Sequence, residues 1–113
     1  MTGPTQRRER RYRRRTVRVL VEYFSNAGLC CDTATTLGAG GMFIQTHDPL
    51  PADSPIKLTF QLPGSSVRHT FEGRVVWANP PAPGAIGAPG MGIEFRDRRA
   101  SQLLAREIER TGD

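Results

Sequence analysis

The chain has 113 residues, of which 37% are hydrophobic, and a formal net charge of +5 at pH 7. A chain of this length can bury one modest core, so we expect a single domain. No apolar run approaches the roughly 20 residues that a membrane-spanning helix needs, and no apolar segment follows the basic N-terminus as in a secretion signal. These features exclude a membrane span and lead us to expect a cytoplasmic protein.

The positive charge is concentrated in an N-terminal arm. Eight arginines and one glutamate between Arg7 and Arg18 give this segment a net charge of +7, so the rest of the chain carries −2. Like charges at this density repel one another and disfavour compact structure. We interpret residues 1–14 as a flexible arginine-rich arm and residues 15–110 as the folded domain. A solvated tail and a nonspecific binder of nucleic acid or anionic lipid are alternative interpretations of the arm.

Alternation of apolar and polar residues after the arm predicts β-strands. Residues 16–23 form the first strand, and its apolar face consists of Val17, Val19, Val21 and Tyr23. Residues 29–36 are rich in β-branched side chains and form the returning strand after a turn at 25–28. Glycines within 38–41 interrupt that strand before residues 42–46 continue the sheet.

The same alternation continues downstream. Three further apolar stripes are separated by turn-forming residues at 63–66 and by a proline- and glycine-rich connection at 79–89. The stripes are Ile56, Leu58, Phe60 and Leu62; Phe71, Gly73, Val75 and Trp77; and Met91, Ile93 and Phe95. We expect the large side chains Met42, Trp77, Met91 and Phe95 to pack in the core rather than to hold a cofactor. Many short strands with regularly spaced turns indicate a closed or nearly closed antiparallel sheet.

Only the C-terminal segment has helical periodicity. Residues from about 98 to 110 carry a stripe at three- and four-residue spacing, which consists of Ala100, Leu103, Leu104, Glu107 and Ile108. Asp97 or Ser101 is the expected N-cap. Because isolated helices of this length are marginal in water, we expect the helix to pack against the barrel or a partner.

Residues that could bind a metal or catalyse a reaction are few and poorly spaced. Cys30 and Cys31 are adjacent, so they cannot form an ordinary intrachain disulfide, and we interpret them as reduced packing residues. His47 and His69 have no ligand-like spacing to these cysteines and no spacing that pairs a nucleophile with a base. The remaining candidates are carboxylates scattered singly, namely Asp48, Asp53, Glu72, Glu94 and Asp97. We predict a non-enzyme with no metal and no cofactor.

Four segments, in their order and spacing, resemble one protein family. They are Arg10-Arg11-Tyr12-Arg13-Arg14 before a Val-x-Val-x-Val strand, the strand start Gly40-Gly41-Met42-Phe43-Ile44, Glu72-Gly73-Arg74-Val75-Val76-Trp77, and Gly90-Met91-Gly92-Ile93-Glu94-Phe95. From about Arg10 to Ile108 the chain resembles a bacterial PilZ domain. The resemblance implies an all-β fold with one helix: a six-stranded antiparallel β-barrel followed by a C-terminal α-helix. It also implies a receptor for cyclic di-GMP.

In this family an Arg-x-x-x-Arg signature in the N-terminal arm takes part in cyclic di-GMP binding. Arg10 and Arg14 match it when the register is set by the following strand, and Arg11 would assist. Arg7 with Arg11, and Arg11 with Arg15, have the same spacing, so other registers satisfy the pattern. Arginine suits this role because its planar fork pairs with two acceptors on a guanine edge or a phosphate and also stacks on a base.

The family's second signature is Asp/Asn-x-Ser-x-x-Gly at a strand turn, and here the chain departs from it. If Gly41 is aligned with the final glycine, where it would permit the turn, Thr36 stands at the Asp/Asn position and Gly38 stands at the Ser position. The carboxylate or amide acceptor is thus replaced by a short hydroxyl, and the second hydroxyl is lost. The hydroxyl of Thr36, backbone N–H groups near the glycines and the surplus arginines could compensate.

The resemblance leaves two functions open. The chain is either an adaptor that binds cyclic di-GMP through its N-terminal arginines, or a degenerate variant that acts as a protein-interaction module of the motility or polarity machinery. We expect no output domain in this protein, so both functions would require a protein partner. A third alternative, nucleic-acid binding by the arm, is disfavoured because the body is net acidic and the whole chain contains only one Trp and two Tyr.

Overall fold

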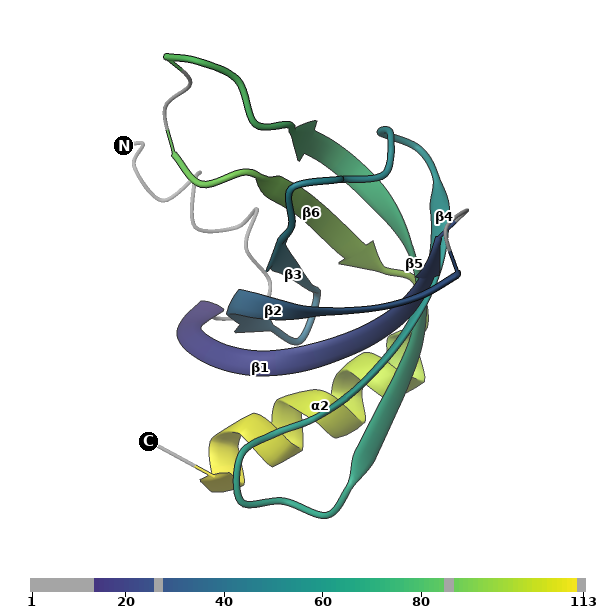
Figure 1. Ribbon diagram of the computed structural model, residues 1–113. Helices are drawn as coiled ribbons and strands as arrows, with labels where there is room; N and C mark the ends of the chain where they lie inside the picture. The colour runs from purple at the N-terminus through teal and green to yellow at the C-terminus, as the bar shows by residue number, and fades with distance from the viewer. Residues whose placement is uncertain (1–13, 26–27, 85–86, 112–113) are drawn as a thin grey trace, which may run out of the picture.

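The computed structural model describes residues 14–25, 28–84 and 87–111. Within these ranges the chain forms six strands and one helix: β1 (Arg14–Ser25), β2 (Gly28–Gly38), β3 (Gly41–Gln45), β4 (Pro55–Gln61), β5 (Arg68–Asn79), β6 (Gly90–Phe95) and α2 (Arg98–Thr111). The strands are antiparallel and close into a barrel in the order β1-β2-β3-β6-β5-β4 (Figure 1). The predicted barrel with a C-terminal helix is confirmed, whereas residues 1–13 of the predicted arm lie outside the described ranges.

One face of each strand fills the interior of the barrel. The predicted stripe of β4 is buried there, and so are Met42 and Met91. In the β1 stripe Val19, Val21 and Tyr23 are buried, whereas Val17 is partly buried against the core. Three phenylalanines stack at the centre: the ring centroids of Phe71 and Phe95 are 4.0 Å apart, and those of Phe60 and Phe71 are 5.9 Å apart. The alternation in the sequence therefore identified most of the core, because a strand that is half buried must repeat with a period of two.

Bulges bend the long strands and change which side chains face the core. In β5 the register shifts between Val75, which pairs with Ile93, and Trp77, which pairs with Gly92, so that Val76 is the extra residue. An extra residue turns the following side chains to the opposite face. Val76 and Trp77 both point outward, and Trp77 is 49% exposed. The prediction that Trp77 packs in the core is therefore wrong.

In the view of Figure 1, helix α2 lies below the barrel, and it contacts β5. It begins after Asp97, whose carboxylate accepts a hydrogen bond from the backbone N–H of Ala100 at 3.2 Å. Leu104 is fully buried, whereas Leu103 is 59% exposed. Successive side chains on a helix point about 100° apart around its axis. Leu104 lies at the middle of the buried face of the helix, so Leu103 lies at the side of that face. The predicted helix is confirmed, but the prediction that Leu103 belongs to its packed stripe is wrong.

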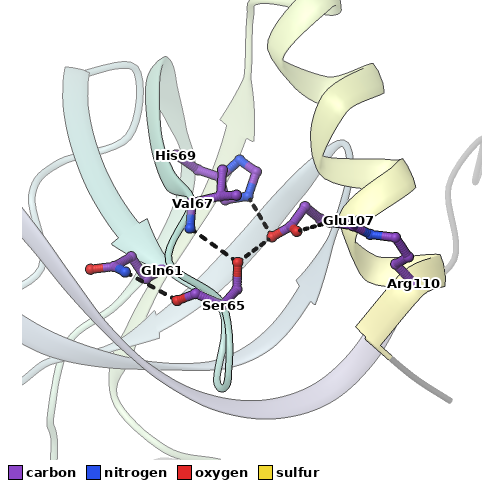
Figure 2. A network of polar contacts seen from close by, with 6 residues as sticks. All are labelled: Gln61, Ser65, Val67, His69, Glu107 and Arg110. Atoms are coloured by element: carbon purple, nitrogen blue, oxygen red, sulfur yellow. Dashed lines mark hydrogen bonds and ion pairs between the residues drawn. The ribbon is translucent and has the colours of Figure 1, made fainter.

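A buried polar network fastens α2 to the barrel (Figure 2). The side chains of Glu107 and His69 are 8% and 5% exposed, and Glu107 Oε1 lies 3.4 Å from His69 Nε2. The same oxygen accepts a hydrogen bond from the Ser65 hydroxyl at 2.8 Å, and Oε2 accepts one from Arg110 at 3.0 Å. A buried carboxylate is tolerated when its oxygens are hydrogen-bonded in this way. No sequence pattern indicated this contact, because Ser65 and His69 lie far from Glu107 along the chain.

Candidate functional site

Of the three arginines predicted to bind ligand, the described residues place one. Arg14 is the first residue of β1, and its backbone lies opposite Gly38 of β2. Arg10, Arg11 and the side chain of Arg14 lie outside the described part of the structure. The pairing of β1 with β2 therefore brings the end of the arginine signature beside the second signature, which occurs much later in the sequence.

The three predicted positions of the second signature lie together on β2 and β3. Thr36 pairs with Thr16 of β1, and Gly38 pairs with Gly41 across the two-residue turn that joins the strands. The intervening Leu37 is 1% exposed and points into the core. Thr36 is partly exposed, whereas Gly38 and Gly41 are buried. Within the described residues, the hydroxyl of Thr36 has no hydrogen-bond partner. Of the three positions, only Thr36 therefore presents a polar side chain toward the outside of the barrel.

Gly41 also allows close packing between two strands. A Cβ atom at this position would overlap the carbonyl oxygen of Ile93 on β6. Gly41 is not among the described glycines with positive φ, so the turn itself does not depend on a left-handed conformation at this residue. The glycine therefore fixes the approach of β3 to β6, a role that the sequence did not indicate.

A pair of aromatic rings continues this outer surface across the barrel. Phe43 on β3 and Trp77 on β5 both lie opposite Gly92 of β6. Their rings stack with centroids 5.3 Å apart and an angle of 17° between the planes. A Cβ at Gly92 would overlap the indole, so the glycine makes room for it. Because Thr36 lies opposite Phe43, one row of paired residues leads from the second signature to an aromatic platform of the kind that stacks on bases.

The neighbouring row ends in a group of charges. Gly41 lies opposite Glu94, and Glu94 lies opposite Arg74. The guanidinium of Arg74 donates hydrogen bonds to Asp53 at 2.7 Å and to Glu94 at 3.2 Å. The carboxylates at 53 and 94 are thus joined through one arginine, and the prediction that they stand singly is wrong. With two carboxylates around one guanidinium, this end of the surface favours hydrogen-bond donors, such as a guanine edge, over phosphates.

The cysteines show no sign of a functional site. Both are free; Cys30 packs partly against the core, whereas Cys31 is exposed. The interpretation of Cys31 as a packing residue is therefore wrong. In the described ranges, no group of three or more His, Cys, Asp or Glu side chains could hold a metal ion. No described helix is long and apolar enough to cross a membrane.

Comparisons with known proteins agree with this geometry. The family model of the PilZ domain matches residues 6–110. The structure of the Bacillus subtilis inhibitor of motility (MotI/DgrA) superposes with a TM-score of 0.70 and 19% sequence identity; the match covers 89% of this chain and 49% of that one. The chain thus spans about half the length of that protein.

A second similar structure is the PilZ domain of CeSA from a cellulose-synthesizing bacterium. It superposes with a TM-score of 0.59 and 18% identity, over 86% of this chain and 98% of that one. No curated protein sequence matches the chain. At these identities the two structures show the shared barrel fold, and the family model supplies the assignment. The chain belongs to the PilZ domain family, whose members are non-enzymatic, cofactor-independent domains associated with cyclic di-GMP binding.

Proposed function

We propose that this protein is a cytoplasmic PilZ adaptor of bacterial second-messenger signalling, which binds cyclic di-GMP and passes the signal to a protein partner. One observation carries the proposal: the register of β1 and β2 sets Arg14 opposite Gly38 and Thr16 opposite Thr36. Arg14, the last residue of the arm, therefore lies beside the second signature. A ligand held by the arginines would rest on the outer surface of β2 and β3.

The residues on this surface suit the parts of a cyclic dinucleotide. Arg10, Arg11 and Arg14 are proposed to pair with guanine and phosphate oxygens, since a guanidinium fork matches both. The stacked Phe43 and Trp77 would support a base, because aromatic stacking on a base contributes about 1–3 kcal/mol.

The altered second signature supports a second candidate function. The threonine at 36 and the glycine at 38 each remove a hydrogen-bonding group relative to the family pattern. Each loss would cost about 1–3 kcal/mol, or roughly five- to a hundredfold in affinity. In the second candidate, the domain binds no nucleotide and acts only through protein contacts. A partner in the motility machinery is proposed by analogy with the inhibitor of motility that shares the fold.

Calorimetry with cyclic di-GMP separates the two functions. We expect the wild type to bind with micromolar affinity, and the Arg10→Ala/Arg14→Ala variant to show no measurable heat. The matched control is Arg99→Ala/Arg106→Ala, which removes the same charge from the exposed face of α2 and should bind as the wild type does. Trp77 is the only tryptophan in the chain and lies on the same outer surface, so its fluorescence should change on binding.

Two results would count against cyclic di-GMP reception. If the wild type gives no heat at high micromolar ligand, the receptor function is excluded and the protein-interaction module is favoured. Cyclic di-AMP, which has the same phosphates and a different base, provides the second comparison. Equal binding of both dinucleotides, with a steep loss of affinity in salt, would indicate nonspecific attraction of phosphates to the arm.

A further inference from the structure

The outer face of the β1–β2 hairpin is unusually apolar. Among the described residues, the three most exposed large hydrophobic side chains all belong to it: Phe24 is 70% exposed, Leu20 is 66% exposed and Leu29 is 62% exposed. Phe24 and Leu29 lie directly opposite each other in the register, and Leu20 points to the same side of β1. None of the three belongs to the core or packs against it. Their exposure is therefore not explained by the fold of the single chain.

The surroundings of this apolar face resemble the anatomy of a protein interface. Beside Leu20 lies a surface hollow of about 430 Å³, whose lining includes Glu22, Cys31 and Arg68. Glu22 and Arg68 form an ion pair of 3.7 Å in which both side chains remain more than half exposed. Interfaces commonly combine an apolar centre with a polar rim that reaches solvent. Here the rim carries charges of both signs.

We infer that this face, centred on the Phe24–Leu29 pair, binds a second copy of the same chain in a symmetric dimer. The barrel is closed, although β1 pairs with β4 only at Val21, Glu22 and Tyr23. We place the contact on the outer sheet face, because the exposed apolar side chains lie there. Because the rim of the face carries both positive and negative charges, a second copy can approach without like charges facing each other at every position. By contrast, the exposed face of α2 carries Arg99 and Arg106 and would repel its own copy.

The area of the face is consistent with a weak dimer. With roughly 200 Å² for each fully exposed large side chain, Phe24, Leu20 and Leu29 together expose roughly 400 Å². A patch of this size on a monomer often marks an interaction site. Stable interfaces bury roughly 800 Å² on each partner, so the three side chains supply about half of that area and the rim would supply the rest. We therefore expect dissociation constants in the micromolar range.

Sedimentation equilibrium of the ligand-free protein tests this inference independently of cyclic di-GMP. Between about 1 µM and about 500 µM, the mass should rise from that of the monomer toward twice that value. Phe24→Ser and Leu29→Ser should each raise the dissociation constant at least about tenfold. Leu103→Ser is the matched control, since it removes a similarly exposed leucine from α2 and should leave the dimer unchanged. Urea unfolding of each variant checks that its fold is intact.

The thiol of Cys31 reports the location of the contact, because this exposed residue lines the hollow beside the face. Its modification rate should fall as protein concentration rises, and the fall should be absent in Phe24→Ser. A monomeric mass over the whole range would overturn the proposal. So would a dimer that Leu103→Ser dissociates while Phe24→Ser and Leu29→Ser do not. Binding of the monomer to phosphatidylcholine vesicles, abolished by Phe24→Ser, would assign the face to a membrane and also reject it.

Discussion

At the scale of single residues, positions 36 and 38 control the proposed ligand site. Thr36→Asp with Gly38→Ser would restore a carboxylate acceptor and a hydroxyl at two positions that the register sets beside Arg14. Gly38 is not among the described glycines with positive φ, so a serine meets no left-handed backbone there. Two restored hydrogen bonds at about 1–3 kcal/mol each should tighten cyclic di-GMP binding by roughly tenfold or more in calorimetry.

A matched variant separates this effect from a change in general charge. Thr33→Asp adds the same carboxylate elsewhere on β2, opposite Gln45 rather than Phe43, and should not improve binding. If the double variant melts as the wild type does and binds no more tightly, then the alignment of Gly41 with the signature glycine is incorrect.

Residue positions that the sequence predicted correctly share one property: their burial follows from simple alternation. Val21 and Leu58 are buried because each continues an unbroken period of two along its strand. Trp77 could not be placed in this way, since Val75, Val76 and Trp77 are all apolar and nothing in their order reveals which one is the bulge residue. The aromatic platform beside Thr36 therefore became visible only from the strand register.

At the scale of elements, docking of α2 depends on one leucine of an adjacent pair. Leu104 is fully buried and Leu103 is 59% exposed, although the two have identical chemistry. Leu104→Ala should lower the free energy of unfolding by about 2–5 kcal/mol, the cost of a cavity in a packed site. Leu103→Ala should change it by no more than about 0.5 kcal/mol, as for most surface substitutions. Urea unfolding followed by circular dichroism measures both, and equal losses in the two variants would refute the observed helix orientation.

The helix also shows where sequence patterns stop being informative about an element. Its period and N-cap were predictable, because spacing and capping are local properties of the chain. The rotation of the helix about its own axis was not predictable, since either of two adjacent leucines could lie at the centre of the buried face. Tertiary contacts decide which face of the helix is buried: Glu107 points inward because Ser65 and His69 form hydrogen bonds with its carboxylate.

At the scale of the whole molecule, local patterns predicted the strands but not how the barrel closes. Contacts between consecutive strands, such as β1 with β2, follow from short turns. Closure needs β1 to pair with β4 and β3 to pair with β6, and these pairs are separated in the sequence. The family resemblance supplied that part of the fold. Closure is also what completes the candidate site, because the pairing of β3 with β6 brings Phe43 to Trp77 across Gly92.

The stability of the whole molecule should depend on pH through Glu107. The hydrogen bond from Ser65 is the main cause that lowers the pKa of this carboxyl below its ordinary value; His69 and Arg110 act in the same direction, and burial opposes them. A carboxyl whose pKa is lower in the folded state stabilises the fold above its unfolded pKa of about 4.3, and this contribution is lost as the pH falls through the folded pKa. Acidification should therefore weaken the attachment of α2 to the barrel.

Glu107→Gln isolates this contribution, because the other titrating groups are common to both proteins. Urea unfolding at constant ionic strength should show a difference in stability between wild type and variant that is constant from neutral pH to about pH 5 and decreases below it. His69 faces the same carboxylate from β5, so Glu107→Gln is also compared in a His69→Gln background, where the decrease should persist because Ser65 remains as the main donor. A difference that is unchanged down to about pH 3 would show that folding does not lower the pKa of Glu107, and a difference that grows on acidification would show that folding raises it.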